Sequence, residues 1–458
     1  MSLSDRLDAA RQRTDESAET PSRRGSDAPR RSAPLDPLAE MKGRAIDTLF
    51  QRIGTRINDS SLTELQLRGL VREELSNILE DEQLLLNFDE RQRLIRDIED
   101  DALGLGPLQR LLEDRNVTEI MVNGHDKIYV EQGGKVTLTE FHFATEDHLR
   151  RVIERIVARV GRRIDESSPL VDARLPDGSR VNAVVPPLAV HGSALTIRKF
   201  SDTPYQVSDL IDFGTISPAI AELLKACVTA KLNILVSGGT GTGKTTLLNV
   251  LSSFIPSDER IVTIEDAVEL KMQQEHVVVL ESRPPNIEGN GEVTIRDLVR
   301  NALRMRPDRI VIGEVRGGES LDMLQAMNTG HDGSISTLHA NTPRDAIARL
   351  ETMVLMAGVE LPLRAVREQI ASAVDMIIQI TRLRDGSRRV THVTEITGME
   401  GETVVLQDAF LFDYTTGLDE EGRFLGHAQA TGLRPRFLDR FDDLGIPYRL
   451  GMFEPERI

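Results

Sequence analysis

The residues best suited to chemistry lie in a glycine-rich stretch between an apolar run and a predicted helix. The stretch fits the pattern G-x-x-x-x-G-K-[ST] in the strand–loop–helix setting that this pattern requires. Its members are Gly238, Gly239, Thr240, Gly241, Thr242, Gly243, Lys244, Thr245 and Thr246. Glycines let the chain turn tightly, so that successive N–H groups and the positive end of the helix converge on one anion. Lys244 would then reach the outer phosphates of a nucleoside triphosphate and the Thr245 hydroxyl would ligate Mg²⁺, so we predict a site for ATP and Mg²⁺.

Acidic side chains follow two predicted buried strands. Glu265 and Asp266 come after the apolar run at 261–264, and Glu314 follows the run at 310–312. The carboxyl ends of parallel strands line the ligand crevice of an α/β sheet, where one carboxylate holds the metal and another polarises the attacking water. We therefore predict Glu314 and Glu265 as catalytic groups and, with Asp266 and Thr245, as metal ligands. An alternative left open is that the acids only cap helices.

A histidine stands at the end of a further predicted strand. His339 follows the run at 334–337, beside the same crevice. A lone histidine is more often a structural hydrogen-bonding residue than a catalytic one. At a strand end beside the phosphate loop, however, His339 is a candidate for a contact with a phosphate or a carboxylate.

Hydrophobic periodicity divides the chain of 458 residues into parts with different patterns. We expect a disordered leader, a small helical bundle, a mixed α+β domain, a linker, an α/β domain with carboxy-terminal strands, and a tail of weak periodicity. Their ranges are, in that order, 1–38, 39–103, 104–200, 201–215, 216–412 and 413–458.

Several shorter patterns predict local structure within these parts. The pair Gly133-Gly134, between two strand-like runs, indicates a hairpin. Thr145, Thr294 and Thr342 are placed to cap the helices that follow them. The segment 362–378 reads as one amphipathic helix.

Composition excludes several classes of protein. No run of 18 or more apolar residues could span a membrane, and the first residues lack the apolar region of a signal peptide. The single cysteine, Cys227, excludes an intramolecular disulfide and a multi-cysteine zinc site. A net charge of −17 and 4% aromatic residues disfavour direct binding to nucleic acid. We therefore expect a cytoplasmic protein.

Four motifs in a fixed order resemble those of the type II/type IV secretion ATPase superfamily. Residues 238–246 resemble its Walker A motif, 264–269 its Asp box, 304–319 its Walker B motif and 329–341 its His box. The wording LRMRPDRIVIGEVRGGE and MNTGHDGSISTLHAN, with RLPDGSR upstream, is most similar to the Flp/Tad pilus assembly ATPases (CpaF type). The resemblance covers about residues 100–412, and no four-cysteine module of the kind found in many type II secretion ATPases is present.

The resemblance implies an α/β fold, with a RecA-like P-loop ATPase domain preceded by a mixed α+β N-terminal domain and ATP in the cleft between them. It also implies a homohexamer on the cytoplasmic face of the inner membrane, bound peripherally through an integral-membrane platform protein whose movement adds or withdraws pilins. Arg174, Arg180 and Arg198 match the arginines with which the N-terminal domain completes the site, beside the Lys244 of the loop. The alternative that they are ordinary surface arginines stays open.

Three other functions remain open on the sequence alone. The same chemistry fits a type IV secretion ATPase that exports protein or DNA. A RecA-like core also serves nucleic-acid translocases, which the negative charge disfavours. A nucleotide-dependent switch with little turnover is disfavoured because both Glu265 and Glu314 are present. The direction of force and the principal catalytic carboxylate are not fixed by these patterns.

Overall fold

The computed structural model describes residues 44–45, 48–49, 51–53, 64–81, 88–200, 204–285 and 289–455. The chain divides into two compact units. The first contains the described residues up to Glu113 together with Phe141–Val152, and the second contains Asp114–Glu140 and the chain from Ile153 onward. The predicted disordered leader lies outside the described residues.

The first unit is built on helices α3 (Glu64–Asp81) and α4 (Phe88–Ala102), followed by the short α5 (Leu108–Glu113). Apolar side chains of α3 and α4 recur every three to four residues and therefore share one face of each helix. Together with Leu49 they form a buried core, whose other main members are Val71, Leu75, Ile78, Leu94, Ile95 and Ile98. The helix that follows, α6 (Glu146–Arg159), begins in this unit. The Oγ1 atom of Thr145 accepts a hydrogen bond from the His148 amide at 3.1 Å, which confirms the predicted cap.

The described part of the second unit contains two sheets. The smaller has the order β3-β2-β1-β6-β5-β4, and all its neighbouring strands are antiparallel. The predicted hairpin at Gly133-Gly134 is confirmed, because these glycines join β2 to β3 with positive φ angles of 56° and 79°. The strands are β1 (Val117–Asn123), β2 (Ile128–Gln132), β3 (Lys135–Leu138), β4 (Leu170–Arg174), β5 (Arg180–Val184) and β6 (Ala194–Arg198).

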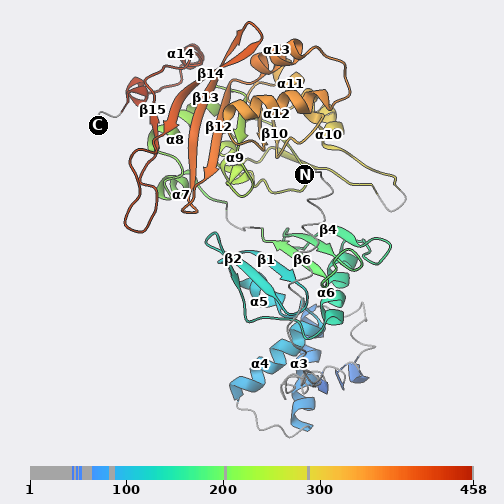
Figure 1. The fold of residues 1–458 in the computed structure, drawn as a ribbon. Coiled ribbons are helices and arrows are strands. Elements are labelled where there is room, and N and C mark those ends of the chain that lie inside the picture. Colours follow the sequence, from blue (N-terminus) through green and yellow to red (C-terminus); the bar gives the residue numbers. More distant parts are fainter. Residues whose placement is uncertain are drawn as a thin grey trace, which may run out of the picture. The chain divides into compact units, whose positions relative to one another are not determined.

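The larger sheet has the order β15-β14-β13-β12-β7-β11-β10-β8-β9. Figure 1 labels β15, β14, β13, β12 and β10 of this sheet. Strands from β12 to β9 are parallel to one another, whereas β13, β14 and β15 are added in antiparallel fashion. The parallel strands are β7 (Ile234–Ser237), β8 (Ile261–Glu265), β9 (Val277–Glu281), β10 (Arg309–Ile312), β11 (Ile335–Leu338) and β12 (Met376–Arg382). The antiparallel ones are β13 (Arg388–Glu400), β14 (Thr403–Phe412) and β15 (Ala428–Ala430).

Helices cover both faces of this sheet, so its central strands are apolar on both sides. In β7, for example, Ile234 and Val236 belong to the core on one face and Leu235 to the core on the other. The first face is covered by α8 (Pro218–Thr229) and α9 (Lys244–Ser252), and the short α7 (Val207–Asp212) precedes α8. The second face is covered by α10 (Ile295–Ala302), α11 (Glu319–Asn328), α12 (Pro343–Leu355) and α13 (Leu363–Ala373) (Figure 1). This is the α/β architecture expected from the sequence.

Two predicted helix caps are confirmed in these elements, and one predicted helix is partly wrong. Thr294 and Thr342 each accept a hydrogen bond from a backbone N–H in the first turn of the following helix, as predicted. The helix predicted over 362–378 is wrong beyond Ala373, because Met376–Arg382 is strand β12. The residues of β12 lie between two neighbouring strands and are buried on both faces, so they lack the alternation that marks a half-exposed strand.

The carboxy-terminal segment is packed onto the first face of the large sheet. It contains β15, helix α14 (Leu438–Leu444) and the 3₁₀ helix η1 (Leu450–Phe453). Phe437, Phe441 and Phe453 belong to the same buried core as α8 and α9. The weak periodicity of this segment had given no indication of such packing. Within the described residues, none of the helices combines the length and the apolar character needed to cross a bilayer.

Candidate active site

The order of the strands places the predicted site residues along one edge of the large sheet. Strand β7, which leads into the phosphate loop, lies beside β11, and β11 lies beside β10, which in turn lies beside β8. Their carboxyl ends are in register, since Ser237 is paired with Leu338 and Ile312 with Ile264. The groups that follow these strands therefore succeed one another along the edge, in the order phosphate loop, His339, Glu314, Glu265.

The phosphate loop has the backbone that its glycines predict. Gly241 and Gly243 have φ angles of +70° and +96°, which disfavour any residue with a side chain, and Gly243 caps the first turn of α9. Gly238 is required by close packing, because a Cβ atom there would lie 2.4 Å from the Ile380 carbonyl oxygen. The glycines therefore permit the loop conformation that presents backbone N–H groups to an anion at the start of the helix.

Lys244 is buried at the start of α9, with 8% of its surface exposed. Its ammonium group donates a hydrogen bond to the Gly239 carbonyl oxygen at 2.9 Å and lies 3.2 Å from Nε2 of His339. Burial lowers the pKa of Lys244, while the nearby charge of Glu314 opposes this shift. The ammonium group is thus enclosed between the loop and the next strand end, where a phosphate would neutralise it.

His339 links Lys244 to Glu314. An ammonium group has only protons to give, so Nε2 of His339 accepts from Lys244, and Nδ1 carries the proton that is donated to Oε1 of Glu314. The Thr240 hydroxyl lies 3.2 Å from the same Nε2 atom. The predicted contact of His339 with a carboxylate is therefore present.

Glu314 also binds Arg316, whose Nε and Nη2 atoms donate to Oε2 of Glu314 at 2.9 and 2.7 Å. Burial would raise the pKa of Glu314, but the hydrogen bonds and charge of Arg316, together with His339, more than offset this and lower it. Glu314 is consequently an ionised carboxylate at neutral pH, as a metal ligand or an acceptor of a proton from water must be.

Glu265 has a different environment. It is buried, with 2% of its surface exposed, and its carboxylate accepts hydrogen bonds from the amides of Glu269 and Leu270 at 2.8 and 3.1 Å. Burial raises the pKa of Glu265 to about 7, although both amides act in the opposite direction. Gly313 makes room for this side chain, since a Cβ atom there would lie 2.9 Å from Cγ of Glu265. The carboxylate therefore fixes the backbone after β8.

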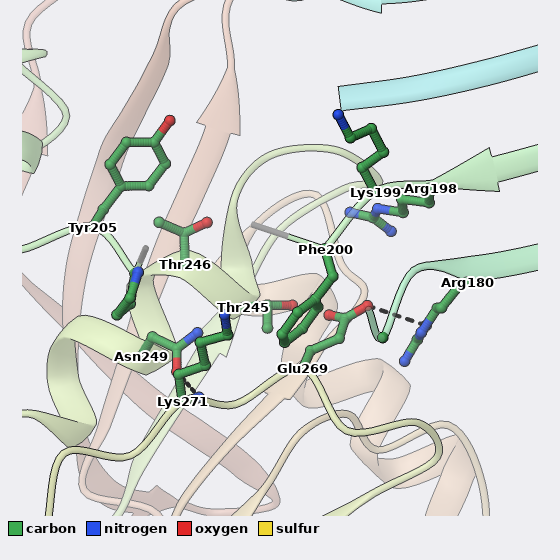
Figure 2. A pocket seen from close by; sticks show the side chains of 12 residues that line it. Arg180, Arg198, Lys199, Phe200, Tyr205, Thr245, Thr246, Asn249, Glu269 and Lys271 are labelled. Carbon is green, nitrogen blue, oxygen red and sulfur yellow. Dashed lines mark hydrogen bonds and ion pairs between the residues drawn. The ribbon is translucent and has the colours of Figure 1, made fainter. Parts of the chain in front are cut away.

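The remaining predicted metal ligands are separated. Asp266 is exposed, accepts a hydrogen bond from the Ser282 hydroxyl at 2.7 Å, and lies 3.5 Å from Arg316. Thr245 lines a cavity of about 160 Å³ together with Thr246, Arg180 and other residues (Figure 2). Of the four predicted metal ligands, Thr245 alone lines this cavity. Glu269, which is not among the predicted site residues, lines it as well.

The three predicted arginines are brought together at one end of the smaller sheet. Arg174 ends β4, Arg180 begins β5 and Arg198 ends β6, and strand pairing sets Arg180 opposite both of the others. Arg180 forms an ion pair with Glu269 at 3.2 Å, which Figure 2 shows at the edge of the cavity. Arg174 forms an ion pair with Glu281, also at 3.2 Å.

Two of these arginines have hydrogen-bond donors that are not used. Nη2 of Arg174 and Nε of Arg180 are buried and have no hydrogen-bond partner among the described residues. Arg174, Arg180 and Arg198 also line a larger cavity of about 1040 Å³ with Asp266 and Arg316. Buried guanidinium donors without partners are costly unless an anion accepts from them, and a guanidinium is well matched to phosphate. The donor set thus fits a polyphosphate.

The residues present also fit Mg²⁺ held jointly with a nucleotide. Among the described residues there is no cluster of three or more His, Cys, Asp and Glu that could hold a metal alone. Mg²⁺ is usually held by one or two protein oxygens together with substrate phosphates and water. Thr245 and Glu314 are the residues that could hold it, and the ion would neutralise charge on the phosphates.

Besides Glu269, two residues at the site were not predicted as functional. Arg316 lies in the stretch quoted as the Walker B motif, and its position two residues after Glu314 was the signal available. Arg388 donates from its Nε to the Gly241 carbonyl oxygen of the phosphate loop at 3.0 Å. Sequence offered no comparable signal for Arg388, because its position depends on the pairing of β12 with β7 and of β13 with β12.

Comparison with known proteins identifies the family of this chain. A model of the family described as "Type II/IV secretion system protein" matches residues 101–411. A putative conjugal transfer protein of Mycobacterium tuberculosis is 41% identical over 313 residues, covering 67% of this chain and 88% of the relative. The conjugal transfer protein TrbB of Rhizobium radiobacter is 34% identical over 310 residues, covering 67% of this chain and 91% of the relative. The VirB11 ATPase of the Brucella suis type IV secretion system, solved with sulphate, aligns at 30% identity over 63% of this chain and 95% of that chain, with a TM-score of 0.35. The chain belongs to the type II/IV secretion system protein family.

Proposed function

We propose that this chain is the cytoplasmic motor ATPase of a Flp/Tad-type pilus, in which Mg²⁺-dependent ATP hydrolysis drives assembly of the fibre. The same motor could also drive retraction of the fibre. The observation that supports the catalytic part is the row of Lys244, His339 and Glu314 along one sheet edge, joined by hydrogen bonds. The wording of the Walker B and His boxes supports the pilus part.

In the proposed reaction the loop N–H groups and Lys244 bind the phosphates, and Thr245 and Glu314 hold Mg²⁺. Glu314 also accepts the proton of the attacking water, because it is ionised and linked to the loop through His339. Glu265 takes the supporting role, since burial raises its pKa to about 7, whereas the pKa of Glu314 is lowered. Asp266 completes the acidic edge from its exposed position.

The mechanical part of the proposal assigns Arg174, Arg180 and Arg198 to the γ-phosphate. The unused donors of Arg174 and Arg180 support this, and Arg198 is paired with Arg180 across the neighbouring strands. A guanidinium that binds the transferred phosphate would couple the presence of that phosphate to the position of the strands that carry the arginines. The motor would act as a homohexamer that is attached peripherally to the inner membrane through an integral-membrane platform protein. Direct binding to nucleic acid is not part of the proposal, in keeping with the net charge of −17.

A second candidate is a type IV secretion ATPase that exports protein or DNA. The specific observation in its favour is the name of the relatives, since proteins described as conjugal transfer proteins are 41% and 34% identical to this chain. Both candidates use the same ATP chemistry and differ in what the movement transports.

The experiment has a biochemical arm and a cellular arm. Wild-type protein should release phosphate from ATP, whereas Lys244→Ala and Glu314→Gln should not. Phosphate release at the same rate by all three proteins would refute the assigned catalytic site. In the host, replacement of the gene by the Glu314→Gln form should abolish surface fibres seen by electron microscopy. Fibres that persist while conjugative transfer or protein export is lost would reject the pilus assignment and support the second candidate.

A further inference from the structure

The turn between β12 and β13 lies against the phosphate loop. A Cβ atom on Gly243 would lie 3.3 Å from Cδ of Arg388, and Nε of Arg388 donates a hydrogen bond to the Gly241 carbonyl oxygen at 3.0 Å. Arg388 is the first residue of β13, and its side chain is otherwise exposed. A residue far along the chain thus contacts the middle of the loop.

The contact with Arg388 determines how the Gly241–Thr242 peptide of the loop is oriented. A peptide unit is planar and trans, so its C=O and N–H bonds point in opposite directions. A guanidinium that holds the Gly241 carbonyl on one side of the loop therefore turns the N–H of Thr242 towards the other side. Gly241 has a φ angle of +70° and lacks a side chain, so its own conformation does little to prevent this peptide from turning over.

The turn that carries Arg388 is itself fixed by several contacts. Asp385 accepts hydrogen bonds from the Ser387 amide at 2.9 Å and from the Phe424 amide at 2.9 Å, so the carboxy-terminal segment holds it. Arg389, next to Arg388, donates to the Phe213 carbonyl oxygen. Arg388 is therefore presented to the loop from a rigid support, which is what a residue needs in order to position another group.

From this geometry we propose that Arg388 is a positioning residue for nucleotide binding: it holds the Gly241–Thr242 peptide so that the Thr242 N–H faces the phosphates of ATP. The inference rests on the proposed binding of ATP phosphates at this loop. It concerns recognition of the polyphosphate rather than of the base. A loop N–H that binds the phosphates equally before and during transfer affects KM and leaves kcat nearly unchanged.

The test compares Arg388→Ala with Arg384→Ala, which removes the same charge from an exposed arginine in the same turn. Binding of Mg-ATP and of inorganic tripolyphosphate is measured by calorimetry, and turnover by phosphate release. We expect Arg388→Ala to weaken binding of both ligands about five- to tenfold, which is the scale of one ordinary hydrogen bond, and to raise KM to the same extent. The value of kcat should stay within about twofold of wild type. Arg388→Lys, which retains a charged donor, should recover part of the loss, and Arg384→Ala should resemble wild type.

Three results would overturn the inference. Equal effects of Arg388→Ala and Arg384→Ala would reduce the role of Arg388 to general positive charge. Weaker binding of ATP with unchanged binding of tripolyphosphate would place Arg388 on the base or ribose. A loss of kcat with unchanged KM would make it part of the catalytic step. Failure of the wild-type protein to bind either ligand would instead refute the proposed function, so the two failures are distinguishable.

Discussion

The Nε2 atom of His339 lies 3.2 Å from Nζ of Lys244, and the opposite ring nitrogen contacts the carboxylate of Glu314. One imidazole thus connects the lysine that binds phosphate with the acid proposed to act on water. Because the ring must donate through Nδ1 and accept through Nε2, its neutral form is the one that satisfies both partners. The arrangement gives His339 a role through Glu314 rather than a separate one.

The first prediction concerns this link. His339→Ala should lower kcat for ATP hydrolysis about 10- to 100-fold, because Glu314 loses the partner that orients it, and should change KM much less. Steady-state phosphate release at several ATP concentrations measures both quantities. His331→Ala is the matched control, since His331 precedes the same strand at its other end. Equal loss of activity in the two variants would show that the effect of His339→Ala comes from the packing of β11 and not from the link.

Much of this site could be predicted from the sequence, because its residues belong to short motifs whose conformation depends on neighbouring residues in the chain. The phosphate loop needs glycines at fixed spacing, and parallel strands end where their apolar runs end, so Lys244, Glu265, Glu314 and His339 could be assigned to one edge. Their order along the edge could not, because it depends on which strands pair. Arg388 could not be predicted for the same reason, because it reaches the loop through the pairing of β12 with β7.

Other features were missed because two interpretations of the same residues compete. The end of the predicted helix at 362–378 is strand β12, since an apolar run of this length fits a buried strand as well as a helix. The two acids Glu265 and Glu314 look alike in the sequence, yet one is held by backbone amides and the other by Arg316 and His339. Burial and partners, which decide their ionisation, follow only from the assembled fold.

The second prediction uses the raised pKa of Glu265. A carboxyl with an ordinary pKa of 4.5 in the unfolded chain and about 7 in the folded protein holds its proton more tightly when folded. Stability contributed by this group is therefore present at low pH and is lost as the pH rises from about 4.5 to about 7, by an amount on the order of 3 kcal/mol. Glu265→Gln should match wild type near pH 5 and be more stable than wild type at pH 8.

Chemical denaturation of the nucleotide-free protein in EDTA, repeated from pH 5 to pH 8, measures this difference. Glu360→Gln, which makes the same substitution at an exposed position, is the control. If the stability difference between Glu265→Gln and wild type were the same at all pH values, Glu265 would titrate alike in the folded and unfolded states. The burial argument would then be wrong.

The third prediction separates binding from turnover at the arginines. Arg180→Ala and Arg198→Ala should keep nucleotide binding, which depends on the loop, but lower turnover at least ~100-fold, because a guanidinium on the transferred phosphate stabilises the transition state. Binding of a fluorescent ATP analogue and phosphate release measure the two properties. Arg151→Ala, an exposed arginine of α6, serves as the control. Equal losses of binding and turnover would assign these arginines a structural role, as the ion pair of Arg180 with Glu269 also allows.

The fourth prediction concerns the carboxy-terminal segment, which lies beyond the residues that match the family model. Phe441 of α14 is fully buried in the core that also contains α8 and α9, and its ring lies tilted against Phe437 and edge-to-face against Tyr448. Removing such a ring leaves a cavity and costs about 3–5 kcal/mol, so Phe441→Ala should lower the midpoint of thermal unfolding by on the order of 10 °C. Leu444→Ala, in the same helix but 57% exposed, should change the midpoint little. The carboxy-terminal segment also holds Asp385 through Phe424, so the Phe441→Ala protein should bind ATP more weakly near its midpoint of thermal unfolding than well below it. If the midpoint of Phe441→Ala equalled that of Leu444→Ala, the segment would not stabilise the core of the large sheet.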